Sequence, residues 1–291
     1  MPLRLRFWGT RGSVPSPGPR TVQYGGNTTC VELRTDDDEL IILDAGTGIR
    51  ELGRSLVAGA NGHAIRGDIF FTHAHWDHIQ GLPFFTPAFQ RGNKFTLWGN
   101  PVLQENIGVV VRQQMSPVVF PVAFDDLSAR IEVRELTTHR HATNGYSVEA
   151  ARVRHPGGAL GFRFSSTSDP ASSVVFIPDN ELDVFGDQAD SDASPPEQLV
   201  SFARGAKVLI HDAMYTGTEY MDHRGWGHSS FRDAIEFAIA AEVETLVLFH
   251  HEPDRSDEEL EDQLTLCRTM VNERGGKVRV LAAQEGSEIV V

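Results

Sequence analysis

Three histidines and an aspartate are crowded into one short stretch, Phe70–Gly81, which reads "FFTHAHWDHIQG". The whole chain of 291 residues holds only 12 histidines, so this density needs a chemical reason. His73 and His75 are two residues apart after an apolar run, and an extended chain there would point both side chains toward one metal ion. Asp77 and His78 follow where a helix is expected to begin, so their side chains can diverge toward a second position nearby.

A site for two metal ions needs more than these four ligands, and three other polar residues each end an apolar run. His155 ends "SVEAARVRH", Asp179 ends "SVVFIPD" and His250 ends "TLVLFH". A strand that stops at such a residue delivers its side chain to the edge of a sheet, where ligands from several strands can meet. Imidazole and carboxylate groups suit zinc, and also manganese or iron. The sequence therefore predicts a two-metal centre, against a surface histidine cluster, and leaves His251 as the alternative to His250.

The elements that must position these residues are short apolar runs and amphipathic segments. Strands are expected at Leu3–Trp8, Cys30–Leu33, Leu40–Leu43, Ile69–Thr72, Phe95–Trp98, Ile131–Leu136, Ser147–Arg154, Leu160–Phe164, Val174–Ile177, Val208–Ile210, Leu246–Phe249 and Val278–Leu281. Helices are expected at 47–58, 195–204, 230–241 and 256–274. This order predicts an α/β fold of four layers, an αββα sandwich, and no linker-like segment divides residues 1–291 into separate domains.

The composition limits the partners that the protein can have. There are 26 Lys and Arg residues against 40 Asp and Glu residues, which gives a net charge of −14. This charge repels phosphate backbones at long range, so a nucleic-acid polymer is not the expected partner. No apolar segment approaches the roughly 18 residues of a membrane span, and no signal peptide is recognisable. A cytoplasmic protein with buried, reduced Cys30 and Cys267 is expected, and a homodimer is the general expectation for a soluble enzyme.

The sequence resembles the metallo-β-lactamase superfamily of binuclear metallohydrolases over nearly its whole length, from "FWGTRGS" to "LFHHEP". The most specific segment is "THAHWDHIQGLPFF". The resemblance implies an αββα sandwich and seven ligands for two divalent ions, with zinc first and manganese or iron as alternatives. One ion would be held by His73, His75 and His155, the other by Asp77, His78 and His250, and Asp179 would bridge both.

Two downstream segments resemble motifs of the tRNA 3′-processing endonuclease branch of that superfamily, and "GTRGSVP" resembles its glycine-rich opening. "LIHDAMY" (209–215) is similar to the His-Glu-Ala-Thr segment of that branch, with Asp212 in place of Glu. "GWGHSS" (225–230) is similar to its Gly-His-Ser-Thr segment, with His228 as the histidine. The resemblance implies that Asp212 orients His228, which meets the scissile phosphate. The alternative for His228 is packing against Trp226 near a helix start.

Phosphodiester hydrolysis is the expected reaction. Two cations about 3.5–4 Å apart would hold a bridging hydroxide and the phosphoryl oxygens, and metal binding lowers the pKa of water to about 7. A protonated His228 held by Asp212 would stabilise the developing charge and protonate the leaving oxygen. Asp77 would move protons at the nucleophile while it binds its metal ion.

A small phosphodiester is the expected substrate, with a cyclic nucleotide as the first choice. The endonuclease branch carries a basic, Gly/Pro-rich arm that grips tRNA. The matching region here, 92–135, lacks such an arm, and its only cations are Lys94, Arg112, Arg130 and Arg134.

Several other residues have both a functional and a structural interpretation, and for others only a position in the fold is expected. Arg11 could reach a phosphate or form a structural ion pair. Three rings of "GLPFFTPAF" could stack on a nucleobase or pack in the core, namely Phe84, Phe85 and Phe89. Among the remaining histidines, a loop is expected for His139 and His141, a polar turn for His63, and a segment over the metal ions for His223.

Three other activities compete with a small-molecule phosphodiesterase. An RNA-directed endonuclease of the tRNA 3′-processing type would use the same chemistry and would need a basic groove. A carboxylic-ester or lactone hydrolase would use the same two-metal centre without an evident need for His228 and Asp212. A diiron redox enzyme would need a flavin partner domain, for which this chain has no room.

Overall fold

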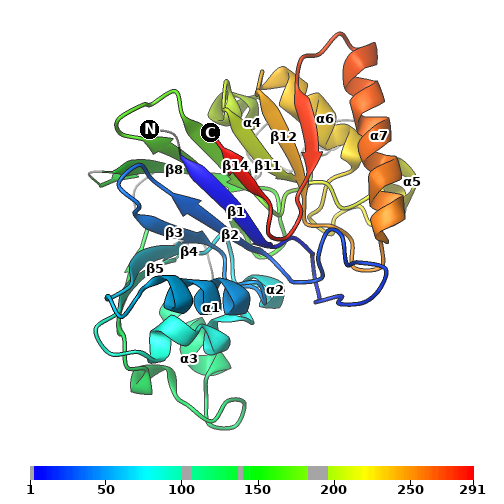
Figure 1. Ribbon diagram of the computed structural model, residues 1–291. Helices are drawn as coiled ribbons and strands as arrows, with labels where there is room; N and C mark the ends of the chain where they lie inside the picture. The colour runs from blue at the N-terminus through cyan, green and yellow to red at the C-terminus, as the bar shows by residue number, and fades with distance from the viewer. Residues whose placement is uncertain (1–2, 100–105, 137–139, 144, 183–195) are drawn as a thin grey trace.

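The computed structural model describes residues 3–99, 106–136, 140–143, 145–182 and 196–291. In this part of the chain two seven-stranded sheets lie face to face, and helices cover the outer face of each (Figure 1). The layers run helices, sheet, sheet, helices, so the predicted αββα sandwich is confirmed. No helix of the described residues is both long and apolar enough to cross a membrane.

The first sheet has the strand order β14-β1-β2-β3-β4-β5-β6. Its members are β1 (Arg4–Gly9), β2 (Cys30–Arg34), β3 (Leu40–Leu43), β4 (Arg66–Phe70), β5 (Lys94–Gly99), β6 (Arg130–Glu135) and β14 (Glu288–Val290). The strands from β14 to β3 pair antiparallel, whereas those from β3 to β6 are parallel. The carboxyl ends of the parallel strands therefore meet at one edge of the sheet.

The second sheet has the strand order β13-β12-β11-β10-β9-β8-β7. Its members are β7 (Arg140–Ala142), β8 (Tyr146–Val153), β9 (Ala159–Ser166), β10 (Ser173–Ile177), β11 (Val208–Asp212), β12 (Thr245–Phe249) and β13 (Arg279–Ala282). The strands β10 to β13 are parallel, and β7 to β10 are antiparallel. This sheet too has an edge at which the carboxyl ends of several parallel strands meet.

The helices divide between the two outer faces (Figure 1). The first sheet carries α1 (Ile49–Gly59), α2 (Trp76–Ile79), α3 (Ile107–Gln114) and the short 3-10 turns η1 (Leu82–Phe84), η2 (Thr86–Phe89) and η3 (Phe124–Asp126). The second carries α4 (Pro196–Ala203), α5 (Gly217–Asp222), α6 (Phe231–Ala240) and α7 (Asp257–Glu273). A capping box begins α7, in which Ser256 and Glu259 each accept a hydrogen bond from the other's backbone N–H.

The core between the sheets is built from the alternate residues of each strand that face inward. Phe70, at the end of β4, is fully buried at its centre. It stacks on Trp98 at a centroid distance of 5.7 Å. It also meets the edges of three rings across the interface, Tyr146 at 6.3 Å, Phe162 at 5.7 Å and Phe164 at 5.3 Å. These aromatic contacts tie the end of a strand that leads into the histidine cluster to the opposite sheet.

The structure corrects several predictions made from local pattern. His141 lies in β7 and not in a loop, because that strand pairs with β8 and the imidazole packs against Trp98 at 4.4 Å; His139 lies outside the described residues. The predicted strand Ile69–Thr72 ends at Phe70. For Phe85 the interpretation as a core residue is confirmed, since it is buried under the first sheet and contacts the ring of Phe95 at 5.0 Å.

The elements β14, α3 and α5 were not predicted from the sequence. The β-branched run in α3 disfavours a helix, but Asn106 caps it by accepting a hydrogen bond from the backbone N–H of Gly108. The short α5 is fixed by a capping box between Thr216 and Glu219. Each of these elements depends on a cap or on a partner strand more than on its own apolar periodicity.

Replacement of Phe70 by alanine is expected to lower the free energy of unfolding by about 3–5 kcal/mol, because it empties the centre of the core between the sheets. Urea denaturation followed by circular dichroism measures the change. Leu266→Ala is the control, since Leu266 is 54% exposed on α7, and its effect is expected to stay within about 0.5 kcal/mol. Equal effects of the two substitutions would contradict this description of the core.

Candidate metal centre

The predicted ligands lie at the carboxyl ends of strands from both sheets. His73 follows β4 of the first sheet, whereas His155 follows β8, Asp179 follows β10 and His250 follows β12 of the second. Two sheets that pack face to face bring these strand ends to one edge of the sandwich, which is the usual place for a site in an α/β fold. The structure therefore unites residues that lie far apart in the sequence.

One cluster contains His73, His75, His155 and Asp179, whose ligand atoms all lie within 4.8 Å of one another. The Nε2 atoms of His73 and His155 are each 3.7 Å from Asp179 Oδ2. His155 Nε2 is also 2.9 Å from His75 Nδ1. The three imidazoles thus converge with one carboxylate oxygen on a single point.

A second cluster contains Asp77, His78 and His250, with ligand atoms again within 4.8 Å of one another. The Nε2 atoms of His78 and His250 are 3.3 Å and 3.1 Å from Asp77 Oδ2. The same two nitrogens are 3.0 Å and 3.4 Å from Asp179 Oδ1. Asp179 therefore turns one oxygen to each cluster, which is the geometry of a bridging carboxylate.

Buried polar atoms without hydrogen bonds test whether these residues fit metal ions. Among the described residues, His73 Nε2, His78 Nε2 and Asp179 Oδ1 are buried and make no hydrogen bond. Leaving such groups unpaired costs free energy, and each of them points into one of the two clusters. A cation in each cluster would satisfy them, so the residues present fit a binuclear metal site.

The charges around the clusters favour a cation as well. Burial lowers the pKa of His73 and of His155, which keeps these imidazoles neutral and able to offer a lone pair. Burial also acts to lower the pKa of His78. The negative charges of Asp179, Asp77 and Asp44 outweigh this effect and raise the pKa of His78 well above its usual value. The excess of carboxylate charge that binds a proton at His78 would equally attract a metal ion.

Asp44 orients one histidine of each cluster, and the sequence reading missed it. Its Oδ2 accepts from His78 Nδ1 at 2.9 Å and from the Thr72 hydroxyl at 2.8 Å. The same hydroxyl lies 3.1 Å from His73 Nδ1. Asp44 is fully buried directly after β3 in a left-handed conformation (φ 58°), so the backbone is strained to aim this carboxylate. Partners of this kind fix the orientation of a metal-binding imidazole.

Glu181 holds the segment that positions His155, and it too was missed. His155 Nδ1 donates to the carbonyl of Gly227 at 2.9 Å. The buried carboxylate of Glu181 accepts from the N–H groups of Gly225 and Gly227 at 2.7 Å and 3.0 Å, and from the hydroxyl of Tyr220 at 2.9 Å. No local sequence signal marks Glu181, because its three partners lie in α5 and in the loop that follows it.

The N-terminal glycine-rich segment positions the second cluster. The N–H of Ser13 donates to Asp77 Oδ2 at 2.8 Å. A Cβ on Gly12 would lie 2.4 Å from the ring of His250, so the backbone packs directly against this imidazole. The predicted glycine-rich opening therefore acts by close approach of its backbone.

Asp212 and His228 form a buried pair beside the clusters. His228 Nδ1 donates to Asp212 Oδ2 at 2.7 Å. The ring of His228 stacks on that of His250 with centroids 4.9 Å apart, and its ligand atom lies within 4.8 Å of those of His250 and Asp179. Burial alone would lower the pKa of His228, but Asp212, and less strongly Asp179 and Asp77, raise it to about 9.

The structure also shows where the other candidate residues from the sequence lie relative to the two clusters. His251 turns away from the clusters and donates from Nε2 to the carbonyl of Ala283 at 2.8 Å, so His250 and not His251 reaches them. Arg11 is fully buried and donates to three backbone carbonyls, those of Gly25, Glu252 and Arg255, which is a structural role. His223 follows α5 and stacks on Tyr215 at 4.6 Å.

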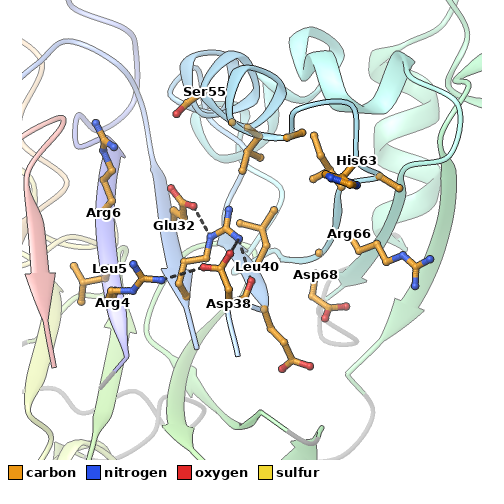
Figure 2. Close-up of a pocket in the computed structure, with 18 of the residues that line it drawn as sticks. Arg4, Leu5, Arg6, Glu32, Asp38, Leu40, Ser55, His63, Arg66 and Asp68 are labelled. Carbon is orange, nitrogen blue, oxygen red and sulfur yellow. Dashed lines mark hydrogen bonds and ion pairs between the residues drawn. The ribbon is translucent and has the colours of Figure 1, made fainter. Parts of the chain in front are cut away.

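A separate cavity of about 760 Å³ lies at the opposite end of the first sheet (Figure 2). Its lining includes Leu40 and Arg66, the first residues of β3 and β4, whereas the clusters lie beyond the last residues of these strands. Its charges pair with one another, for example Arg34 with Glu32 at 2.7 Å and with Asp38 at 3.4 Å. None of the candidate metal-binding groups among the described residues lies there.

The fold and the two His/Asp clusters define a metal-dependent hydrolase of α/β architecture. The chain belongs to the metallo-β-lactamase superfamily, because residues 40–251 match the family model described as "Beta-lactamase superfamily domain". The resemblance seen in the sequence is thereby confirmed.

Curated relatives and solved structures agree with this assignment. Ribonuclease Z of Staphylococcus haemolyticus is 25% identical over 287 residues, which cover 85% of this chain and 88% of that protein. Ribonuclease Z of Gemmatimonas aurantiaca is 25% identical, and the match covers 98% of each protein. Unliganded yeast PDE1 has a TM-score of 0.71 at 19% identity and covers 100% of this chain and 99% of its own. Human tRNase Z, short form, has a TM-score of 0.65 at 19% identity and covers 98% of each chain.

Substitution of Asp44 by asparagine is expected to lower zinc affinity about 10–100-fold, because His73 and His78 lose the carboxylate that fixes their ring orientation. Titration of the metal-free protein with zinc in the presence of a competing chelator measures it. Asp68→Asn is the matched control, since Asp68 is a carboxylate in the middle of β4 that accepts from Trp98 and Tyr146 and belongs to neither cluster. Unchanged zinc affinity in Asp44→Asn would contradict the role given to Asp44.

Removal of metal ions is expected to lower the melting temperature, since ligands that bind only the folded state stabilise it by mass action. Zinc at 100 times its dissociation constant contributes about 2.7 kcal/mol, which corresponds to roughly 4 °C for a chain of this length. Differential scanning fluorimetry with chelator and with added zinc measures the shift. In Asp179→Ala, which lacks the carboxylate shared by both clusters, zinc should no longer produce it; an equal shift in this variant would place the zinc elsewhere.

Proposed function

We propose that the protein is a metal-dependent phosphodiesterase that hydrolyses a small phosphodiester, with a cyclic nucleotide as the first candidate. One observation carries the proposal. His228, which is hydrogen-bonded to Asp212, has a ligand atom within 4.8 Å of those of Asp179 and His250. Hydrolysis of a phosphodiester needs a proton donor for the departing oxygen, and this pair could supply it. An ester or lactone hydrolase on the same centre has no evident use for such a pair.

The proposed ligand sets follow the two clusters. The first ion is assigned to His73, His75 and His155, the second to Asp77, His78 and His250, and Asp179 is shared. Zinc is the first candidate, and manganese or iron would accept the same ligands. When bound, two such ions supply an activated water and neutralise phosphoryl charge.

The chain's own residues then hold and move protons at defined atoms. His228 uses Nδ1 for Asp212, which leaves Nε2 for the leaving oxygen of the substrate. Asp212 is itself held by the N–H groups of Met214 at 3.1 Å and Asn180 at 3.3 Å, so the pair is fixed before substrate binds. Such preorganisation is what stabilises charge that develops in the transition state. Asp77 would accept a proton at its carboxylate while it helps to hold the second ion.

The charge distribution supports a small substrate. In the region 92–135, where the related endonucleases carry a basic arm, each of the four cations pairs with a carboxylate. Lys94, Arg130 and Arg134 all contact Glu132, and Arg112 contacts Asp125. In all, this region holds four cations against five carboxylates, Glu105, Asp125, Asp126, Glu132 and Glu135. On a chain with a net charge of −14 it therefore offers a polyanion little attraction.

An RNA-directed endonuclease is the second candidate, because the curated relatives are named Ribonuclease Z. It would use the same ligands and the same His228–Asp212 pair. The two candidates therefore differ in how the substrate reaches the centre, and the paired cations favour the small phosphodiester.

Replacement of His228 by alanine is expected to lower kcat for bis-p-nitrophenyl phosphate and for the best cyclic nucleotide by about 10²–10³, because the transition state loses one preorganised donor. Zinc content should stay unchanged, since His228 is not among the assigned ligands. Steady-state kinetics and metal analysis measure the two quantities.

His63→Ala is the matched control, because His63 is exposed near the start of β4 at the other end of the sheet, and full activity is expected. A pre-tRNA and a p-nitrophenyl ester complete the substrate panel. If His228→Ala hydrolyses phosphodiesters as fast as the wild type, the assigned role is wrong. Turnover of the ester alone, indifferent to His228, would establish an ester hydrolase instead.

A further inference from the structure

Two of the four tryptophans are exposed, and both adjoin the metal centre. Trp76 is 67% exposed and Trp226 is 61% exposed. Trp8 and Trp98, in contrast, are largely covered and donate their indole N–H groups to carboxylates. Large exposed rings are costly in water, and a pair of them beside one site differs from the scattered exposed apolar residues of an ordinary surface.

The two indoles belong to segments that converge on the same pair of imidazoles. Trp76 directly follows His75. Trp226 directly precedes Gly227, whose carbonyl accepts a hydrogen bond from His155 Nδ1 at 2.9 Å. The opposite nitrogen of His155 lies 2.9 Å from His75 Nδ1. The segment that carries Trp76 therefore reaches this imidazole pair from the first sheet, and the segment that carries Trp226 reaches it from the second.

The first cluster is accessible at His75. The imidazole of His75 is exposed, whereas His73, His78 and His250 are buried. Gly157, in the loop after β8, lies close to this imidazole, since a Cβ there would be 3.9 Å from His75 Nε2, an ordinary contact distance. A substrate group bound at the first cluster can therefore extend outward on the side of His75.

The indole of Trp226 is held in place by its neighbours. It meets the ring of His223 edge-on at 4.8 Å, and His223 stacks on Tyr215 at 4.6 Å with an angle of 18° between the planes. His223 Nδ1 donates to the carbonyl of Glu219 at 2.7 Å, which fixes the middle ring. A ring that is fixed in advance loses little entropy when a ligand packs on it.

We infer that Trp76 and Trp226 form a subsite for the flat base of a nucleotide whose phosphate lies at the metal centre; this inference rests on the proposed function. A net charge of −14 gives the chain no long-range attraction for an anionic substrate. Stacking on aromatic side chains supplies affinity that does not depend on charge, and every nucleobase offers a flat face for it. The shared chemistry is a base carried on a phosphoester, either in a free nucleotide or at the end of an RNA.

The test compares two phosphate ligands that differ only in the base. Dissociation constants of adenosine 5′-monophosphate and ribose 5-phosphate are measured by calorimetry on the zinc-loaded protein. Wild type is expected to bind the nucleotide at least tenfold more tightly. Trp76→Ala and Trp226→Ala should each weaken nucleotide binding by about tenfold and leave ribose 5-phosphate unchanged, whereas Trp76→Phe and Trp226→Phe should retain most of the preference.

Controls separate this inference from the proposed function. Leu266→Ala, an exposed apolar residue on α7, should leave both dissociation constants unchanged. Equal binding of the two ligands by wild type, or an unchanged preference in both alanine variants, overturns the base subsite even if phosphodiesters are hydrolysed. If the preference for the nucleotide over ribose 5-phosphate depends on the tryptophans but no phosphodiester is hydrolysed, the base subsite is supported and the proposed function is wrong.

Kinetics distinguish the two sources of the base. A rise in KM of Trp76→Ala and Trp226→Ala for a cyclic nucleotide assigns the subsite to free nucleotides. A rise for a pre-tRNA alone assigns it to an RNA end. An unchanged KM for both substrates contradicts a role of the two indoles in substrate binding.

Discussion

The carboxylate of Asp179 turns one oxygen to each histidine cluster, and the rest of the site depends on that arrangement. The first cluster draws on the end of β4 in one sheet and the end of β8 in the other, so a single carboxylate can serve both clusters only if the sheets hold a fixed relative position. The aromatic core around Phe70 provides this rigidity directly beneath the site. Several buried ligand atoms lack hydrogen bonds, so folding bears a desolvation cost that bound cations would offset.

Around the ligands lies a ring of groups that fixes their orientation. Asp44 holds His78 directly and His73 through the hydroxyl of Thr72. Glu181 holds the loop whose carbonyl receives His155. Each support reaches its ligand from a different strand end or loop. The imidazoles therefore stand ready in the folded chain, and binding of ions needs little rearrangement.

In the proposed function, charge at the metal centre and apolar surface outside it would contribute separately to substrate binding. The centre itself carries excess carboxylate charge, which suits cations, and the cations in turn would suit a phosphate. Outside the centre the chain is acidic, and the lysine and arginines of 92–135 are paired with glutamate and aspartate. In the proposed base subsite, the exposed indoles of Trp76 and Trp226 would add affinity without adding positive charge.

The sequence by itself determined the layered architecture and the seven ligand positions to be tested, because both depend on local signals. Apolar runs of strand length are visible in sequence, and so are polar residues that end them, such as Asp179 and His250. Local pattern also misplaced His141, whose strand β7 depends on its pairing with β8, and missed α3, whose start depends on the cap Asn106. Only the tertiary structure decided between His250 and His251, made Arg11 structural and revealed Asp44 and Glu181. These outcomes depend on which way a side chain points and on partners distant in the chain, and no spacing along the sequence carries that information.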